Sequence, residues 1–181
     1  MLGYSAGGVI AYAMAGRLLE LGEQVTFLGL IDSLADPTEE PFFRETLAAL
    51  ERQTEADARD ATALLATMAP VVVDPSRQQE LTRLGRAGDV STMIELLRRG
   101  GEIPSELDES AVRRLLRVQT SILCATGRYR PSPRPLSATL FRAARDGVTD
   151  PTLGWGALLR DGLRVVPVDG DHFTSNSALC V

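Results

Sequence analysis

The sequence predicts an α/β fold in which a mostly parallel sheet carries helices on both faces and is interrupted by a helical insertion. Three observations predict it. Short, continuous apolar runs at 25–31, 137–143 and 163–168 suit strands that are covered on both faces. Small and apolar residues dominate 6–21, as in a buried helix. Between the first two apolar runs, residues 36–129 repeat apolar side chains with the 3.6-residue period of helices.

The first predicted helix begins directly after Ser5 and ends before Gly22, a residue that commonly stops helices. Small and apolar side chains surround nearly its whole circumference, so we expect it to be buried rather than amphipathic. The strand predicted over 25–31 follows at once and leads directly into Asp32. Ligands bind and catalytic groups project at the carboxyl ends of strands in open α/β sheets. Asp32 is therefore a candidate site residue.

Residues 36–129 are expected to form a helical lid. One apolar cluster with helical spacing surrounds Leu64 and Leu65, and another surrounds Met93 and Leu97. The last helix is the longest and opens with a polar start signal at 108–110. Prolines at positions 131, 133 and 135 then end the helical region, after which the strands predicted over 137–143 and 163–168 resume the sheet.

Composition excludes several classes of function. The chain has 181 residues, of which 44% are hydrophobic, and its net charge of -5 disfavours a nucleic-acid partner, which needs clustered positive charge. Cys124 and Cys180 lack metal-ligand spacing, so we expect neither a metal nor a disulfide framework. No stretch approaches the roughly 20 apolar residues of a membrane helix, and no targeting segment is evident. These features predict a cytoplasmic protein without membrane attachment.

A candidate nucleophile lies near the start of the chain. Gly3-Tyr4-Ser5-Ala6-Gly7 fits the pattern Gly-x-Ser-x-Gly, in which both glycines relieve crowding so that the serine can occupy a strained strand-to-helix turn. The buried helix and the strand predicted after it are the context that this nucleophile elbow requires. The alternative interpretation is a tight turn that merely opens a helix.

A serine nucleophile needs a general base and an orienting acid. His172 is the single histidine of the chain, so it must be the base, and it follows the last predicted strand, where it can lie over the serine. Asp32 can hold the imidazole in the tautomer that accepts the serine proton. Asp146 also follows a predicted strand and competes with Asp32 as the acid.

Five segments occur in this order along the chain: Gly-Tyr-Ser-Ala-Gly-Gly, Leu-Gly-Leu-Ile-Asp-Ser, Thr-Leu-Phe-Arg-Ala, Gly-Trp and Gly-Asp-His-Phe. In sequence and order they resemble the type I thioesterase domains that end nonribosomal peptide and polyketide synthases, members of the α/β-hydrolase superfamily. The resemblance places the acid in the Ile-Asp-Ser segment, and so favours Asp32. It implies a triad of Ser5, Asp32 and His172, with the backbone N–H of Ala6 as an oxyanion donor.

The resemblance also implies a substrate class and a partner. An upstream carrier-protein domain would present an acyl, peptidyl or polyketide chain as a phosphopantetheine thioester, and transfer to the serine would precede release by hydrolysis or macrocyclisation. No cofactor of the domain itself is implied. The helical lid over 36–129 would cover the acyl-binding cavity.

One departure from the family pattern concerns the start of the sequence, because the family has several strands before the elbow whereas four residues precede Ser5 here. We therefore expect residues 1–181 to be a partial domain without its N-terminal strands and without the second oxyanion donor. Low stability and weak activity would follow. Two alternatives remain: an editing-type thioesterase or another esterase of the same fold, in which Asp146 is the acid, and a catalytically inert fragment.

Overall fold

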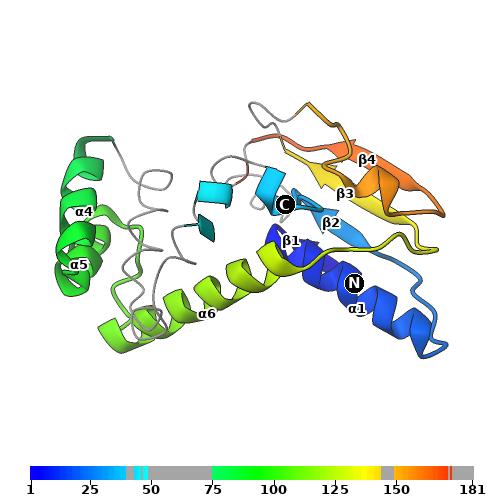
Figure 1. Ribbon diagram of the computed structural model, residues 1–181. Coiled ribbons are helices and arrows are strands. Elements are labelled where there is room, and N and C mark those ends of the chain that lie inside the picture. Colours follow the sequence, from blue (N-terminus) through cyan, green and yellow to red (C-terminus); the bar gives the residue numbers. More distant parts are fainter. Residues whose placement is uncertain (40–42, 46, 49–74, 144–148, 171, 173–181) are drawn as a thin grey trace. The chain divides into compact units, whose positions relative to one another are not determined.

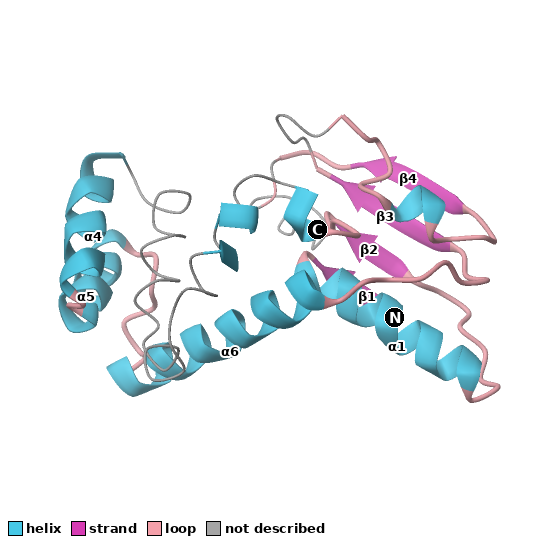
Figure 2. Cartoon of the chain, in the orientation of Figure 1, coloured by secondary structure: helices cyan, strands magenta, loops and turns pink. Residues whose placement is uncertain are grey.

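The computed structural model describes residues 1–39, 43–45, 47–48, 75–143, 149–170 and 172 (Figures 1 and 2). The chain divides into two compact units, one comprising Met1–Glu40 and Thr126–Val181 and the other Pro41–Ala125. The first unit holds the sheet, and the second holds helices. Each unit is described by itself below. The predicted α/β fold class is confirmed.

The first unit is built on a parallel sheet with the strand order β1-β2-β3-β4 in its described part (Figure 1). The strands are β1 (Leu2–Tyr4), β2 (Gly29–Ile31), β3 (Ala138–Arg142) and β4 (Leu163–Pro167). Tyr4 pairs with Ile31, and Ile31 pairs with Phe141. The carboxyl ends of the first three strands therefore meet at one edge of the sheet, and the segments that follow them begin side by side.

The strands predicted over 137–143 and 163–168 are confirmed as β3 and β4, but the strand predicted over 25–31 is too long. Only Gly29–Ile31 form β2. The reason is pairing: β1 offers three residues, Leu2 to Tyr4, and their partners are Gly29 to Ile31. An apolar run indicates where a strand can form, whereas the length of the strand depends on its neighbours.

Helix α1 (Ala6–Glu20) packs against β1 and β2, as Figure 1 shows. It ends as predicted, because Gly22 adopts a left-handed φ of 81° just beyond it. The expectation that this helix is buried all round is wrong for the described structure. Ile10 and Met14 are 41% and 54% exposed, whereas Ala11, Tyr12 and Ala15 are buried. Although apolar residues surround the helix, only one of its faces is buried.

The core of the first unit joins α1 to the segments around β3 and β4. The rings of Tyr12 and Trp155 lie 5.0 Å apart, and both side chains are fully buried. The Tyr12 hydroxyl donates to the carbonyl of Ser132 at 2.8 Å, and burial raises the pKa of this phenol above its ordinary value. Arg134 forms an ion pair with Glu20 at 2.9 Å. These contacts fasten the chain that leads into β3 onto α1.

The second unit contains α4 (Pro75–Ala87), α5 (Val90–Gly100) and most of α6 (Glu109–Arg128). Helices were expected around Met93 and in the last part of the insertion, and α5 and α6 confirm them. The apolar cluster around Leu64 and Leu65 lies outside the described residues. The buried core of this unit consists of Leu81, Leu84, Val90, Met93, Ile94, Leu97 and Val112. The role of this unit as a lid stays a prediction.

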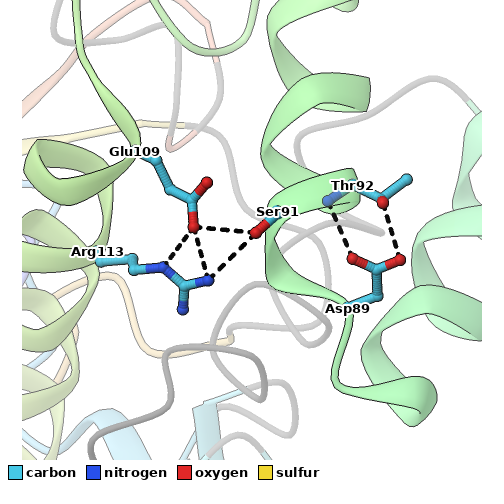
Figure 3. A network of polar contacts seen from close by, with 5 residues as sticks. All are labelled: Asp89, Ser91, Thr92, Glu109 and Arg113. Atoms are coloured by element: carbon cyan, nitrogen blue, oxygen red, sulfur yellow. Dashed lines mark hydrogen bonds and ion pairs between the residues drawn. The ribbon is translucent and has the colours of Figure 1, made fainter.

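Polar contacts fix the starts of α5 and α6 (Figure 3). Asp89 caps α5 by accepting hydrogen bonds from the backbone N–H and the hydroxyl of Thr92, at 3.1 and 2.8 Å. The Ser91 hydroxyl donates to Glu109 of α6 at 3.0 Å, and Arg113 donates to the same carboxylate at 2.8 Å. The hydrogen bond from Arg113 lowers the pKa of Glu109, with a further contribution from Ser91. This network links α5 to α6.

Within the described ranges, the structure contains no helix that is long and apolar enough to cross a membrane.

Candidate active site

The elbow turn is present between β1 and α1, with Ser5 at its tip. Ser5 has φ 51° and ψ -125°, an unfavourable conformation for a residue with a side chain. Its backbone N–H donates to the carbonyl of Ile31 at 2.9 Å, which ties the turn to β2. A Cβ atom on Gly3 would lie 2.1 Å from the carbonyl oxygen of Gly7. Only glycine at position 3 lets the chain turn back this sharply. The expectation that both glycines relieve crowding is wrong for Gly7, because a Cβ atom there would meet no atom within 4 Å.

Asp32 is held rigidly directly after β2. It is fully buried, and its own φ of 41° is left-handed. Its backbone N–H donates to the carbonyl of Phe141 at 2.7 Å, and its Oδ1 atom accepts a hydrogen bond from the N–H of Ala143 at 3.1 Å. A buried carboxylate requires such partners because burial removes its water. The segment after β3 therefore determines where Asp32 points.

His172 lies in the loop after β4 and meets Asp32. Its Nδ1 atom is 2.6 Å from Oδ2 of Asp32, and the imidazole side chain is 15% exposed. A carboxylate at Nδ1 favours the tautomer that carries the proton there, so the lone pair lies on Nε2. The imidazole also stacks on the ring of Tyr4, with centroids 5.1 Å apart. Since Tyr4 directly precedes Ser5, the structure brings the predicted acid and base to the elbow.

The remaining predicted site residues are Ala6 and Asp146. Ala6 is the first residue of α1, and the first backbone N–H groups of a helix have no partner inside the helix. The N-terminus of a helix also favours negative charge. The rival acid, Asp146, lies outside the described residues. Among the residues that the structure describes, no group of three or more His, Cys, Asp or Glu side chains is placed to hold a metal ion.

A second set of contacts, not predicted from the sequence, holds the segment after Asp32. The indole N–H of Trp155 donates to the carbonyl of Ser33 at 2.7 Å, and the N–H of Ala35 donates to the carbonyl of Leu153 at 2.9 Å. The Trp155 side chain is fully buried and packs in the core of the first unit. Its hydrogen bond additionally ties the loop around 150–155 to the segment that carries the acid.

Comparison with known proteins identifies the family. A family model described as "Thioesterase domain" matches residues 1–180. The chain belongs to this family. This thioesterase domain is 29% identical over 143 residues to a dimodular nonribosomal peptide synthase of Bacillus subtilis (strain 168), an alignment that covers 79% of the chain. It is 41% identical over 63 residues, or 31% of the chain, to enterobactin synthase component F of Escherichia coli (strain K12).

Solved structures agree on the fold of this thioesterase domain. A four-domain nonribosomal peptide synthetase bound to AMP and glycine superimposes with a TM-score of 0.60 at 23% identity, covering 95% of the chain and 13% of the synthetase. The Vlm2 thioesterase domain, solved with a bound dodecadepsipeptide, gives a TM-score of 0.57 at 21% identity and covers 98% and 65% of the two chains. At these identities the likeness concerns the fold alone.

The chain spans only 5% of the length of either curated relative. Both relatives are synthases, and this thioesterase domain matches one part of each. The family and the fold of the domain are thus established.

Proposed function

We propose that this thioesterase domain releases an acyl, peptidyl or polyketide chain from the phosphopantetheine thioester of a carrier protein, through an ester on Ser5. The observation that carries the proposal is the contact between Asp32 and His172, 2.6 Å long, directly beside a strained serine turn. A buried carboxylate bound to a histidine next to an elbow serine is the arrangement that activates a hydroxyl for attack on a carbonyl.

In the first half-reaction, the Ser5 hydroxyl oxygen attacks the thioester carbonyl carbon while Nε2 of His172 takes the hydroxyl proton. The resulting oxyanion faces the N-terminus of α1, where the N–H of Ala6 donates to it. When the tetrahedral intermediate collapses, the carbon–sulfur bond breaks, and the departing thiol takes the proton from His172. The acyl chain is then an ester of Ser5.

In the second half-reaction, His172 removes a proton from the group that attacks this ester. Water gives a free carboxylic acid, and an amine or hydroxyl of the acyl chain itself gives a macrocycle. Either attack regenerates the Ser5 hydroxyl, because the ester oxygen leaves with the proton from His172. Asp32 stabilises the imidazolium in both halves.

The substrate and the partner are proposed from the relatives. One curated relative is a nonribosomal peptide synthase and the other is a component of enterobactin synthase, as their names state. We therefore assign this domain an upstream carrier-protein domain as its partner and a carrier-bound acyl or peptidyl thioester as its substrate. The reaction needs no metal and no cofactor of the domain itself, since the phosphopantetheine arm arrives with the substrate.

The test is covalent labelling of the 181-residue chain with a fluorophosphonate, followed by intact-protein mass spectrometry. We expect one adduct in the wild-type chain and none in Ser5→Ala. Incubation with an acyl-pantetheine thioester is likewise expected to acylate the wild-type chain and to leave Ser5→Ala unmodified. An adduct that persists in Ser5→Ala would place the nucleophile elsewhere, and a wild-type chain that reacts with neither reagent would support an inert fragment.

A further inference from the structure

Tyr4 makes two contacts with His172 that the proposed mechanism does not use. Its ring stacks on the imidazole, with centroids 5.1 Å apart and planes inclined by 19°. Its hydroxyl donates a hydrogen bond to the backbone carbonyl of His172. The two residues are 168 positions apart in the sequence. The face of the imidazole and the backbone of the same residue are therefore both held by one side chain.

The hydrogen bond to Asp32 by itself does not stop the imidazole from rotating about that bond. The Oδ2 atom of Asp32 fixes Nδ1, but a ring held at one atom can still swing about that hydrogen bond and carry Nε2 away from the serine. A stacked aromatic ring opposes this swing because it restricts the plane of the imidazole. The bond from the Tyr4 hydroxyl restricts the backbone from which the imidazole projects. These contacts and the one from Asp32 together restrict the position of Nε2.

The fold gives Tyr4 this position without a separate structural element. Tyr4 ends β1, and its partner in the sheet is Ile31, the residue before Asp32. The contacts that orient the base thus come from two adjacent strand ends, one bearing the acid and the other bearing the aromatic ring. Ser5 follows Tyr4 directly, so the position of the nucleophile and the position of the base are set by neighbouring residues of one rigid turn.

We propose that Tyr4 is a positioning residue, which keeps Nε2 of His172 aimed at Ser5 through ring stacking and through its hydrogen bond to the His172 backbone. The proposal rests on the proposed function insofar as it concerns catalysis. It assigns Tyr4 no proton transfer and no contact with the acyl chain. Its loss should therefore change kcat and the state of the imidazole, and leave KM unchanged.

The first experiment observes the imidazole directly. His172 is the single histidine of the chain, so ¹⁵N-histidine labelling gives one pair of imidazole nitrogen resonances that need no assignment. In the wild-type chain we expect the resonances of a tautomer protonated at Nδ1. In Tyr4→Leu, which lacks the ring and the hydroxyl, we expect resonances averaged between tautomers and a faster exchange of the Nδ1 proton. Tyr4→Phe keeps the ring and should give an intermediate result.

The second experiment measures thioester hydrolysis with an acyl-pantetheine substrate. A hydrogen bond of about 0.5–1.5 kcal/mol corresponds to about 2- to 13-fold in rate, which is the loss of kcat expected for Tyr4→Phe. Tyr4→Leu, which also loses the stacking, should lose about 10- to 100-fold. Tyr129→Phe removes a phenol hydroxyl elsewhere and serves as the matched control. Circular dichroism of each variant verifies that it is folded.

Two results would overturn the proposal. Nitrogen resonances and kcat that match the wild type in both Tyr4 variants would show that Asp32 suffices to position the base. A raised KM with unchanged kcat would show that Tyr4 contacts the substrate instead. Failure of the proposed function looks different: the wild-type chain would not react with the fluorophosphonate, while the resonances of His172 would still respond to the Tyr4 substitutions.

Discussion

Replacement of Asp32 by asparagine tests the proposed chemistry most directly, because it changes one atom of a fully buried side chain. The asparagine oxygen can still accept the N–H of Ala143, now 3.1 Å from Oδ1. The amide nitrogen then faces Nδ1 of His172, and since it is a donor, Nδ1 must accept. The imidazole is forced into the tautomer protonated at Nε2, which cannot take the serine proton.

The expected loss in kcat for Asp32→Asn is about 10,000-fold, the magnitude found when a serine protease acquires the wrong histidine tautomer in the same way. Stability should fall little, since the bond to Ala143 persists. Asp32→Ala, in contrast, leaves the buried N–H of Ala143 unsatisfied, and this costs about 1–3 kcal/mol of unfolding free energy. The pair therefore separates an effect on chemistry from an effect on folding.

The assay for both variants is hydrolysis of an acyl-pantetheine thioester, combined with urea unfolding monitored by tryptophan fluorescence. Asp146→Asn is the matched control, because Asp146 is the rival acid, and we expect its activity to be close to that of the wild type. If Asp32→Asn keeps more than a tenth of the wild-type kcat while Asp146→Asn is inactive, the acid is Asp146 and the proposed roles are wrong.

Three further predictions concern the framework of the site. Gly8→Ala should destabilise the domain by about 1–3 kcal/mol through overpacking, because its Cβ atom would lie 2.5 Å from Cβ of Ser33. In a Ser33→Gly background the same substitution should lower the free energy of unfolding much less, and equal losses in urea unfolding would contradict the contact. Trp155→Phe should lower both stability and kcat, since it removes the hydrogen-bond donor to the carbonyl of Ser33, the residue after the acid. An unchanged melting temperature would show that this hydrogen bond does not contribute to stability. Ser5→Gly should be more stable than Ser5→Ala by about 1–3 kcal/mol, because glycine tolerates a φ of 51°. Equal melting temperatures of the two variants would mean that the turn is unstrained.

The sequence predicted the elements well where one local rule determines them. The Gly-x-Ser-x-Gly pattern predicted the turn at Ser5, and the polar start at 108–110 predicted α6, whose N-terminus is capped by Asp108 through the N–H of Ala111 at 2.6 Å. The position of Asp32 at the end of a strand was likewise evident from the apolar run before it. In each case, the residues that determine the feature are adjacent in the chain.

Features that depend on distant partners were missed or only partly predicted. The extent of β2 depends on the length of β1, and the exposure of Met14 depends on what packs against α1. The stacking of Tyr4 on His172 and the bond from Trp155 to Ser33 join residues more than a hundred positions apart. No sequence pattern around Tyr4 indicates that its ring contacts a histidine so far along the chain. The choice of Asp32 over Asp146 depended on family resemblance for the same reason.

The contacts that immobilise Asp32 have a consequence for how such domains can diversify. Asp32 precedes the second unit in the chain, whereas the residues that bind it and the segment after it follow that unit. They are Phe141, Ala143, Leu153, Trp155 and His172. All of them belong to the first unit, so these contacts lie within one unit. We therefore expect the acid to keep its place in chimaeras that exchange the segment between residues 40 and 126 for a foreign one.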